Sequence, residues 1–170
     1  MREALLRLVA QQALALDDRN TPCVPLTSRA WFLEIHAVRG DLEGRISREL
    51  VTHITPEQVA ILADRHRAFI TAYEAADPRG AAIANVVFHS TAASFSRLLL
   101  TVGLIRGLWV RMGPIYAATN CLPTINPADA DHPHQLMMDA FLRRDADGLV
   151  EALRRDFMQA RSWLEPLLPD

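Results

Sequence analysis

Hydrophobic residues recur every three or four positions over most of the chain, which is the spacing of amphipathic α-helices. Residues suited to begin helices lie between these segments: Thr27 or Ser28, the Thr55–Pro56 pair, and Asp145. No segment past residue 27 alternates as a strand does, so the body of the chain is predicted to be all-α. The predicted helices span about residues 2–14, 27–51, 56–77, 81–95, 96–112, 129–144 and 146–164.

Prolines break the helical pattern at two places. Pro22 and Pro25 exclude a helix after the Asp- and Asn-rich stretch at residues 17–20, so we expect a turn there with short extended pieces on either side. Gly113–Pro114 is predicted to end the helix that begins near residue 96, and a loop should then run from residue 118 to residue 127.

The segment from Ala81 to Phe95 has no glycine, proline or formally charged side chain and is apolar on nearly every side. Such a helix is expected in the middle of a bundle rather than at its surface. It contains Asn85 and His89, four residues apart, so both side chains leave one face of the helix a single turn apart. Buried polar groups need partners, and these two residues are therefore candidates for a functional site.

The last two predicted helices meet at Asp145 and should pack as an antiparallel hairpin. His134 lies eleven residues before Asp145 and Asp156 lies eleven after it, so these two side chains can face each other at the same height. A buried carboxylate needs a cation or strong hydrogen-bond donors. Two imidazoles, one carboxylate and one amide oxygen suit a divalent transition metal with an open position for a small anion, and they come from Asn85, His89, His134 and Asp156.

Each of these residues also has a simpler interpretation. An inward-facing histidine is more often a hydrogen-bonded core residue than a metal ligand, and Asn85 can satisfy a backbone group. Asp156 can instead pair with Arg39 or Arg106. The metal hypothesis therefore depends on the four side chains sharing one interior site.

Composition narrows the class of protein. Half of the residues are hydrophobic and the formal net charge is −2, so the chain as a whole does not attract nucleic acid or acidic membranes. Cys23 and Cys121 have no metal or redox spacing, which is typical of a cytoplasmic protein. Glu3 and Arg7 interrupt the N-terminal apolar run, which therefore does not fit a signal peptide. The longest apolar segment elsewhere, Leu98–Ile105, is too short to span a bilayer.

Three motifs occur in order along the chain: Val38-Arg-Gly-Asp-Leu-Glu43, Asn85-Val-Val-Phe-His89, and a segment from His134 through Ala140-Phe141 to Asp145. They resemble the Val-Arg-x-x-Leu-Glu, Asp-x-x-Phe-His and His-x-x-Ile-x-x-Ala-Leu-x-x-x-Asp motifs of bacterial GntR-type transcription regulators. The likeness is to the FadR-like subgroup, whose effector-binding domain is the all-helical FCD domain. It implies an antiparallel bundle of six to seven helices over residues 27–170.

The resemblance also implies a metal held by one Asp and three His. Asn85 stands where the family has the Asp, His89 and His134 match, and Asp156 stands where the family has its last His. The acid has thus moved from the first ligand position to the last. Zinc and nickel are the ions that we expect.

A small carboxylate effector is expected beside this metal. Arg39 matches an arginine that faces the cavity in the family, where it could bind the carboxylate, and Arg106 is a second candidate. Equally, Arg39 can form a salt bridge with Glu43, four residues on.

The N-terminal residues resemble part of a DNA-binding domain. The run from Met1 to Leu8 is similar to the Pro-Val-Arg-Glu-Ala-Leu-x-x-Leu that ends the family's recognition helix, and residues 13–25 correspond to the β-wing. Residues 1–26 are thus interpreted as a remnant of a winged helix-turn-helix, left by a start codon placed too late or by a true truncation. Arg2 is the candidate DNA contact, and this chain should bind DNA weakly or not at all.

The sequence therefore predicts a ligand-responsive, homodimeric transcription regulator that binds a small organic acid next to a divalent metal. It would bind operator DNA only when the missing N-terminal part is present. The alternative is a stand-alone metal- or acid-binding module that no longer binds DNA. An enzyme is not favoured, because the sequence has no HExxH motif, nucleophile elbow or Gly-rich phosphate loop.

Overall fold

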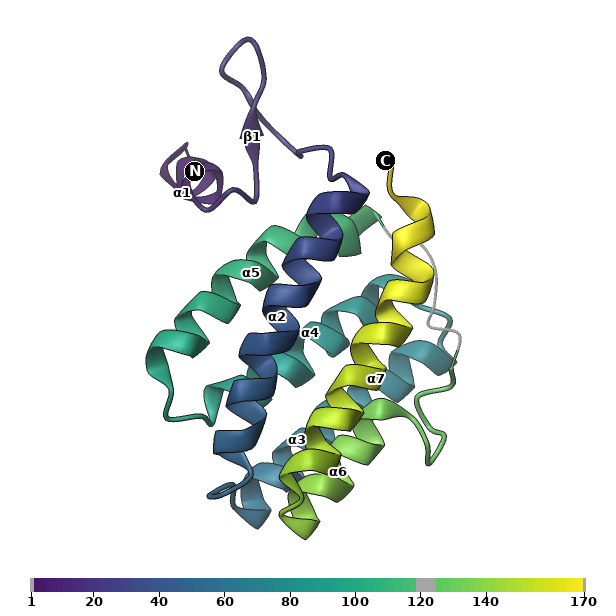
Figure 1. Ribbon diagram of the computed structural model, residues 1–170. Coiled ribbons are helices and arrows are strands. Elements are labelled where there is room, and N and C mark those ends of the chain that lie inside the picture. The colour runs from purple at the N-terminus through teal and green to yellow at the C-terminus, as the bar shows by residue number, and fades with distance from the viewer. Residues whose placement is uncertain (1, 119–124, 170) are drawn as a thin grey trace.

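The computed structural model describes residues 2–118 and 125–169, and over these residues it confirms the all-α prediction (Figure 1). Seven α-helices lie within the described part, together with one two-stranded antiparallel hairpin. The helices are α1 (Arg2–Ala10), α2 (Arg29–Leu50), α3 (Pro56–Glu74), α4 (Pro78–Ser94), α5 (Leu99–Ala118), α6 (Pro133–Arg143) and α7 (Ala146–Leu164). The strands are β1 (Ala15–Leu16) and β2 (Pro22–Cys23), and a short 3₁₀ helix, Glu165–Leu167, follows α7.

Capping residues set the helix starts that the sequence predicted. The Ser28 side chain accepts a hydrogen bond from the backbone at the start of α2. Thr55 and Gln58 form a capping box at the start of α3, in which each side chain bonds the other residue's backbone N–H. Asp145 caps α7 by accepting from the Gly148 N–H at 2.8 Å. These bonds satisfy backbone donors that have no partner within the helix.

The prediction that Gly113–Pro114 ends the fifth helix is wrong, because α5 continues through this pair to Ala118. Proline removes one backbone donor and so deprives the carbonyl of Val110, four residues earlier, of its helical partner. Val110 is 37% exposed, so water can reach this part of the helix. Beyond the proline, Ile115 and Tyr116 are buried, and their burial favours a continued helix.

The sixth helix also differs from the prediction, since it begins at Pro133 rather than near residue 129. His132 is its N-cap and Pro133 occupies the first turn, a position where proline's missing N–H costs nothing. The loop predicted over residues 118–127 falls partly on residues 119–124, which lie outside the described residues, as does Cys121.

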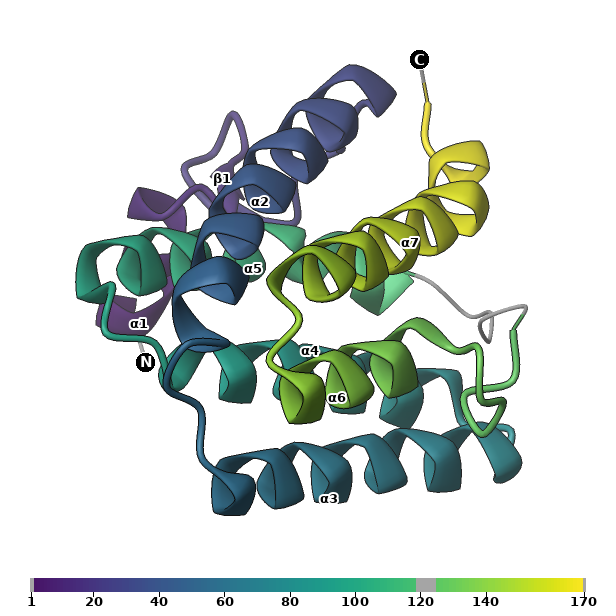
Figure 2. The same ribbon diagram turned by 60° about the horizontal axis from the view of Figure 1, so that its bottom comes forward.

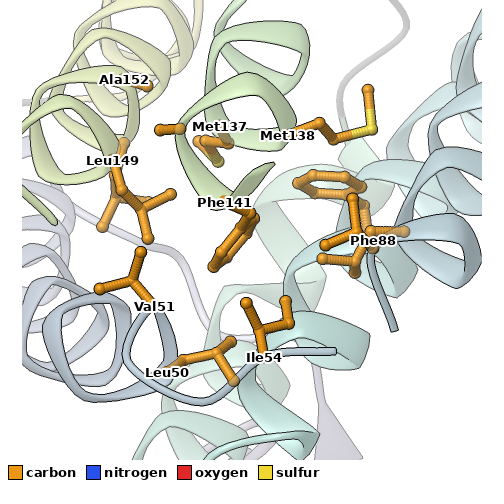
Figure 3. Close-up of a cluster of buried hydrophobic side chains, with 13 residues drawn as sticks. Leu50, Val51, Ile54, Phe88, Met137, Met138, Phe141, Leu149 and Ala152 are labelled. Carbon is orange, nitrogen blue, oxygen red and sulfur yellow. The ribbon is translucent and has the colours of Figure 1, made fainter. Parts of the chain in front are cut away.

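The helices form layers, with α3 on one side, α4 and α6 in the middle, and α2, α5 and α7 on the other side (Figure 2). The α4 helix is not enclosed on every side as expected, because Ile83 and Val87 are 56% and 38% exposed. Its other face is buried at Phe88. Figure 3 shows Phe141 pointing into the core, with Leu149 on one side and Phe88 on the other. This core holds α3, α4, α6 and α7 together.

The N-terminal part lies outside the bundle (Figure 1). Helix α1 has no buried residue, and the turn between β1 and β2 is the one that the sequence predicted. Asp17 accepts backbone hydrogen bonds within this turn, and Asn20 has a φ of 57°, which asparagine tolerates. Arg111 of α5 donates to the carbonyl of Gln11 at 2.9 Å and so ties this part to the bundle. Among the described residues, no helix has the length and apolar content needed to cross a membrane.

Candidate metal and effector site

Three buried or half-buried side chains from three helices meet inside the bundle: His89 of α4, His134 of α6 and Asp156 of α7. One oxygen of Asp156 lies 3.1 Å from Nε2 of His89, and the other lies 3.4 Å from Nε2 of His134. The two Nε2 atoms are 3.3 Å apart. The prediction that His134 and Asp156 face each other across the last helical hairpin is therefore confirmed.

The triangle of donor atoms has the dimensions of a metal site. Bonds of about 2.1 Å at tetrahedral angles separate ligand atoms by about 3.4 Å. The two histidine Nε2 atoms are 3.3 Å apart, and each faces a different oxygen of Asp156, at 3.1 Å for His89 and 3.4 Å for His134. Two imidazoles and one carboxylate leave a fourth position for another ligand. These residues fit a divalent transition metal, whose binding stays a prediction.

Neighbouring side chains hold both rings in place. Phe88 lies parallel to the His134 ring, with ring centres 4.0 Å apart and planes 11° apart. Glu43 Oε2 lies 3.4 Å from Nδ1 of His89. A carboxylate behind a metal-binding histidine commonly fixes the proton on the far nitrogen, and Glu43 is placed for that role. Its contact with His89 was not predicted from the sequence.

Arg39 forms a buried ion pair with Glu43, whose oxygen is 2.9 Å from the guanidinium. Arg39 is 2% exposed and Glu43 is 6% exposed. The guanidinium lies 3.6 Å from the ring centre of Trp109 and also bonds the Tyr116 side chain. The salt bridge between Arg39 and Glu43, expected as one interpretation of Arg39, is thus present. Arg39 also faces the interior, as its role as an effector ligand would require.

A narrow cavity joins these groups. Its lining includes Arg39, Asn85, Trp109, Tyr116 and Asp156, and in this conformation it is too narrow to admit a water molecule. Asn85, predicted as a metal ligand, therefore lies at the same cavity as Asp156. Ligation by Asn85 is not tested by the structure and stays a prediction.

Two other predicted site residues lie elsewhere. Arg106 is exposed and lines two hollows on the outside of α5 rather than the inner cavity. The helical repeat explains this, because Ile105 and Trp109 take the inward positions of α5 and Arg106 points about 100° away from Ile105. The structure does not bring Arg106 to the site. Arg2, the candidate DNA contact, is exposed on α1.

The site holds paired charges away from water. Burial would lower the pKa of His89, but Asp156 and Glu43 outweigh it and raise this pKa to about 9. Burial would raise the pKa of Asp156, yet His89 and His134 hold it well below its usual range. Burial likewise opposes ionisation of Glu43, and Arg39 with His89 keeps its pKa low. Both carboxylates are therefore ionised at neutral pH.

Four other histidines are neutral at this pH. Burial, with Arg39 nearby, lowers the pKa of His36 to about 4. Burial and the neighbouring His134 lower the pKa of His66 to about 4 and that of His132 to about 3. Burial also lowers the pKa of His134 itself, despite its contact with Asp156.

The sequence reasoning missed His36, His66 and His132 as interior residues. His66 follows Leu62 by four positions and precedes Phe69 by three, so the apolar repeat of its helix could have placed it inside. No comparable repeat marks His132, which precedes its helix.

Comparisons with known proteins agree with this fold. The FCD domain family matches residues 34–159. The chain is 30% identical over 166 residues to the HTH-type transcriptional regulator McbR of Escherichia coli (strain K12). The aligned region covers 94% of this chain and 72% of McbR.

Solved structures show the same likeness. The structure of E. coli McbR/YncC matches with a TM-score of 0.86 and 28% identity, over 98% of this chain and 84% of that one. A Streptococcus agalactiae GntR matches with a TM-score of 0.62 and 19% identity, over 95% of this chain and 79% of that one, and it supports the fold alone. The chain belongs to the FCD-domain family of GntR-type transcriptional regulators.

Proposed function

We propose that this chain is a ligand-responsive regulator whose helical domain binds a small organic acid next to a divalent transition metal, zinc or nickel. His89, His134 and Asp156 would hold the ion, with Asn85 as the candidate fourth ligand, and Arg39 would bind the acid. The observation that carries the proposal is the triangle formed by His89, His134 and Asp156, in which the facing donor atoms of each pair are 3.1 to 3.4 Å apart, beside an inward-facing arginine. A bound ion would supply a positive centre that attracts a carboxylate.

In this conformation the Glu43 carboxylate forms an ion pair with the guanidinium of Arg39, the interaction that we expect an effector carboxylate to make. An incoming acid must therefore compete with Glu43, and it must widen a cavity that does not admit water. Widening requires movement of α2, α5 or α7, which supply most of the lining. Effector binding would thereby favour a second arrangement of these helices.

Helix α5 gives this movement a route to the N-terminal part. Trp109 and Tyr116 of α5 line the cavity, and Arg111 of the same helix bonds the carbonyl of Gln11 beside α1. In a homodimer, such a shift would change the spacing of two DNA-binding parts and so couple effector to operator binding.

The second candidate is a cytoplasmic metal- or acid-binding module that does not bind DNA. The observation that favours it is the poverty of positive charge at the hairpin turn, where Asp17 and Asp18 accompany Arg19. Phosphate contacts supply most DNA affinity. Electrophoretic mobility shift on promoter fragments tests this candidate, since a salt-dependent shift would refute the module and support the regulator.

Thermal unfolding with a panel of small mono- and dicarboxylic acids, with and without Zn²⁺, tests the pocket. A true effector at a hundredfold excess over Kd stabilises the fold by about 2.7 kcal/mol. Isothermal calorimetry on folded Arg39→Gln should show loss of acid binding, whereas the matched surface variant Arg106→Gln should bind as the original chain does. Equal acid binding by both variants would refute the assignment of Arg39.

A further inference from the structure

Two more buried histidines lie beside His134. His66 comes from α3, and His132 immediately precedes α6. The ring centres are 5.3 Å apart for His66 and His134, 5.0 Å for His132 and His134, and 5.5 Å for His66 and His132. Each ring offers a nitrogen within 4.8 Å of the other two. None of these distances involves the carboxylate of Asp156, so the three rings form a second cluster, which shares His134 with the first.

Two nitrogens in this cluster are buried and have no hydrogen-bond partner within the described residues: Nδ1 of His66 and Nδ1 of His134. The two residues are 3% and 0% exposed, so bulk solvent does not reach these atoms. An unsatisfied buried polar atom costs about 1–3 kcal/mol, which makes two in one cluster unusual.

The opposite nitrogens of both rings already have partners. His66 bonds the backbone of Pro127, and the acceptor must be the carbonyl because proline has no N–H. Nε2 of His134 faces Asp156 at 3.4 Å. A ring that donates through one nitrogen keeps its lone pair on the other, so both unpartnered Nδ1 atoms are available as ligands. A backbone carbonyl or carboxylate behind the ring is the usual support of a metal-binding histidine.

We propose that His66, His132 and His134 form a second site, which binds a divalent transition metal ion through imidazole nitrogens alone. Three imidazoles on one tetrahedral ion, with bonds of about 2.1 Å, place their ring centres about 5 Å apart. The observed separations are 5.0 to 5.5 Å. Zn²⁺, Co²⁺, Ni²⁺ and Cu²⁺ are the ions that this ligand type suits.

His132 is the weakest of the three ligands. Its Nδ1 accepts the backbone N–H of His134 at 3.2 Å and so caps α6. It can bind an ion only by giving up this cap or by losing the proton from Nε2. The rings of His66 and His132 also lie only 26° from parallel, so ligation would turn them apart.

His134 belongs to both sites but gives each a different nitrogen. The first site, formed by His89, His134 and Asp156, uses Nε2 of His134, which faces His89 and Asp156. The second site uses Nδ1. A neutral imidazole has one lone pair, so His134 serves one ion at a time. The second site otherwise stands independently of the proposed effector site.

Titration of the metal-stripped chain with Co²⁺, followed by visible absorption, tests the proposal. His89→Gln removes a ligand of the first site only, so the Co²⁺ binding that this variant retains should report the second site. In that background His66→Gln, which retains a donor for Pro127, should weaken binding by at least about 100-fold. His132→Asn, which retains a side-chain cap, should do the same. Circular dichroism confirms that each variant folds.

A second measurement needs no change in the cluster. Cu²⁺ bound to His89→Gln should show electron paramagnetic resonance couplings to three nitrogens. Loss of all Co²⁺ binding in His89→Gln would overturn the proposal and leave the first site standing. Co²⁺ affinity in His89→Gln that stays the same when His66→Gln or His132→Asn is added would overturn it as well. Cu²⁺ couplings to fewer than three nitrogens would have the same consequence. In the original chain, Co²⁺ binding without any response to organic acids would instead contradict the proposed function alone.

Discussion

Mild acid should unfold this domain, because several histidines are buried in their neutral form. The perturbation is a change from pH 7.5 to pH 5.0 in the presence of a metal chelator. His36, His66 and His132 have pKa values lowered from 6.5 to about 4, 4 and 3 in the folded chain. A lowered histidine pKa stabilises the fold above the unfolded pKa of 6.5, and this stability is lost as pH falls toward the folded value.

The size of the effect follows from proton linkage. At pH 5.0 the unfolded chain binds protons that the folded chain excludes. This lowers the free energy of unfolding by about 2 kcal/mol for each of these three histidines. His89 acts in the opposite direction, because its pKa is raised to about 9. Its stabilising effect is complete below 6.5 and lost as pH rises through 9, so it gains about 1 kcal/mol over the same interval. The expected net loss is about 5 kcal/mol, comparable with the whole stability of a small domain.

Urea unfolding at the two pH values, followed by circular dichroism, measures this loss. His36→Leu provides the matched variant, because His36 packs between Phe32 and Phe157 and its Nε2 has no hydrogen-bond partner within the described residues. The difference between the two pH values is taken within each protein, the original chain and His36→Leu. The effect of the substitution on packing, which is the same at both pH values, then cancels. The loss in His36→Leu should be smaller by about 2 kcal/mol. Equal unfolding free energies at both pH values, or an unchanged pH dependence in His36→Leu, would refute the reasoning.

Three further predictions concern stability and are checked by chemical denaturation at pH 7.5. Asp145→Ala removes the cap of α7 and should cost about 1 kcal/mol, whereas Asp147→Ala, which loses only an exposed ion pair, should cost less. Arg39→Met leaves Glu43 buried without its guanidinium and should cost about 3–5 kcal/mol, and similar stability to the original chain would contradict this. Pro114→Ala restores a helical hydrogen bond inside α5 and should stabilise the fold, by up to about 3 kcal/mol.

Local chemistry explains what the sequence alone could predict. The start of α7 at Ala146 was predicted correctly because Asp145 caps this helix. The same turn fixes the register of the hairpin, so equal spacing was enough to bring His134 opposite Asp156. Arg39 and Glu43 are four residues apart on one helix, and their ion pair follows from that spacing.

Contacts between helices that are distant in the sequence could not be predicted in this way. The approach of Glu43 to His89 depends on how α2 packs near α4, which no local pattern records. The local rule for Pro114 failed because the burial of Ile115 and Tyr116 outweighs one lost hydrogen bond. Arg106 was considered by residue type without its helical phase, and the phase decides that it points outward.

The charges of the site explain why a metal and an acid would bind together. Arg39 and protonated His89 carry two positive charges, and Glu43 and Asp156 carry two negative ones, so the buried cluster is neutral without an ion. A divalent ion at the triangle must displace the proton that His89 holds toward Asp156, and the cluster would then carry one net positive charge. Burying an uncompensated charge is costly, and one carboxylate entering beside Arg39 would remove it. Metal and monoanion are thus expected to strengthen each other's binding, by the same factor in each direction.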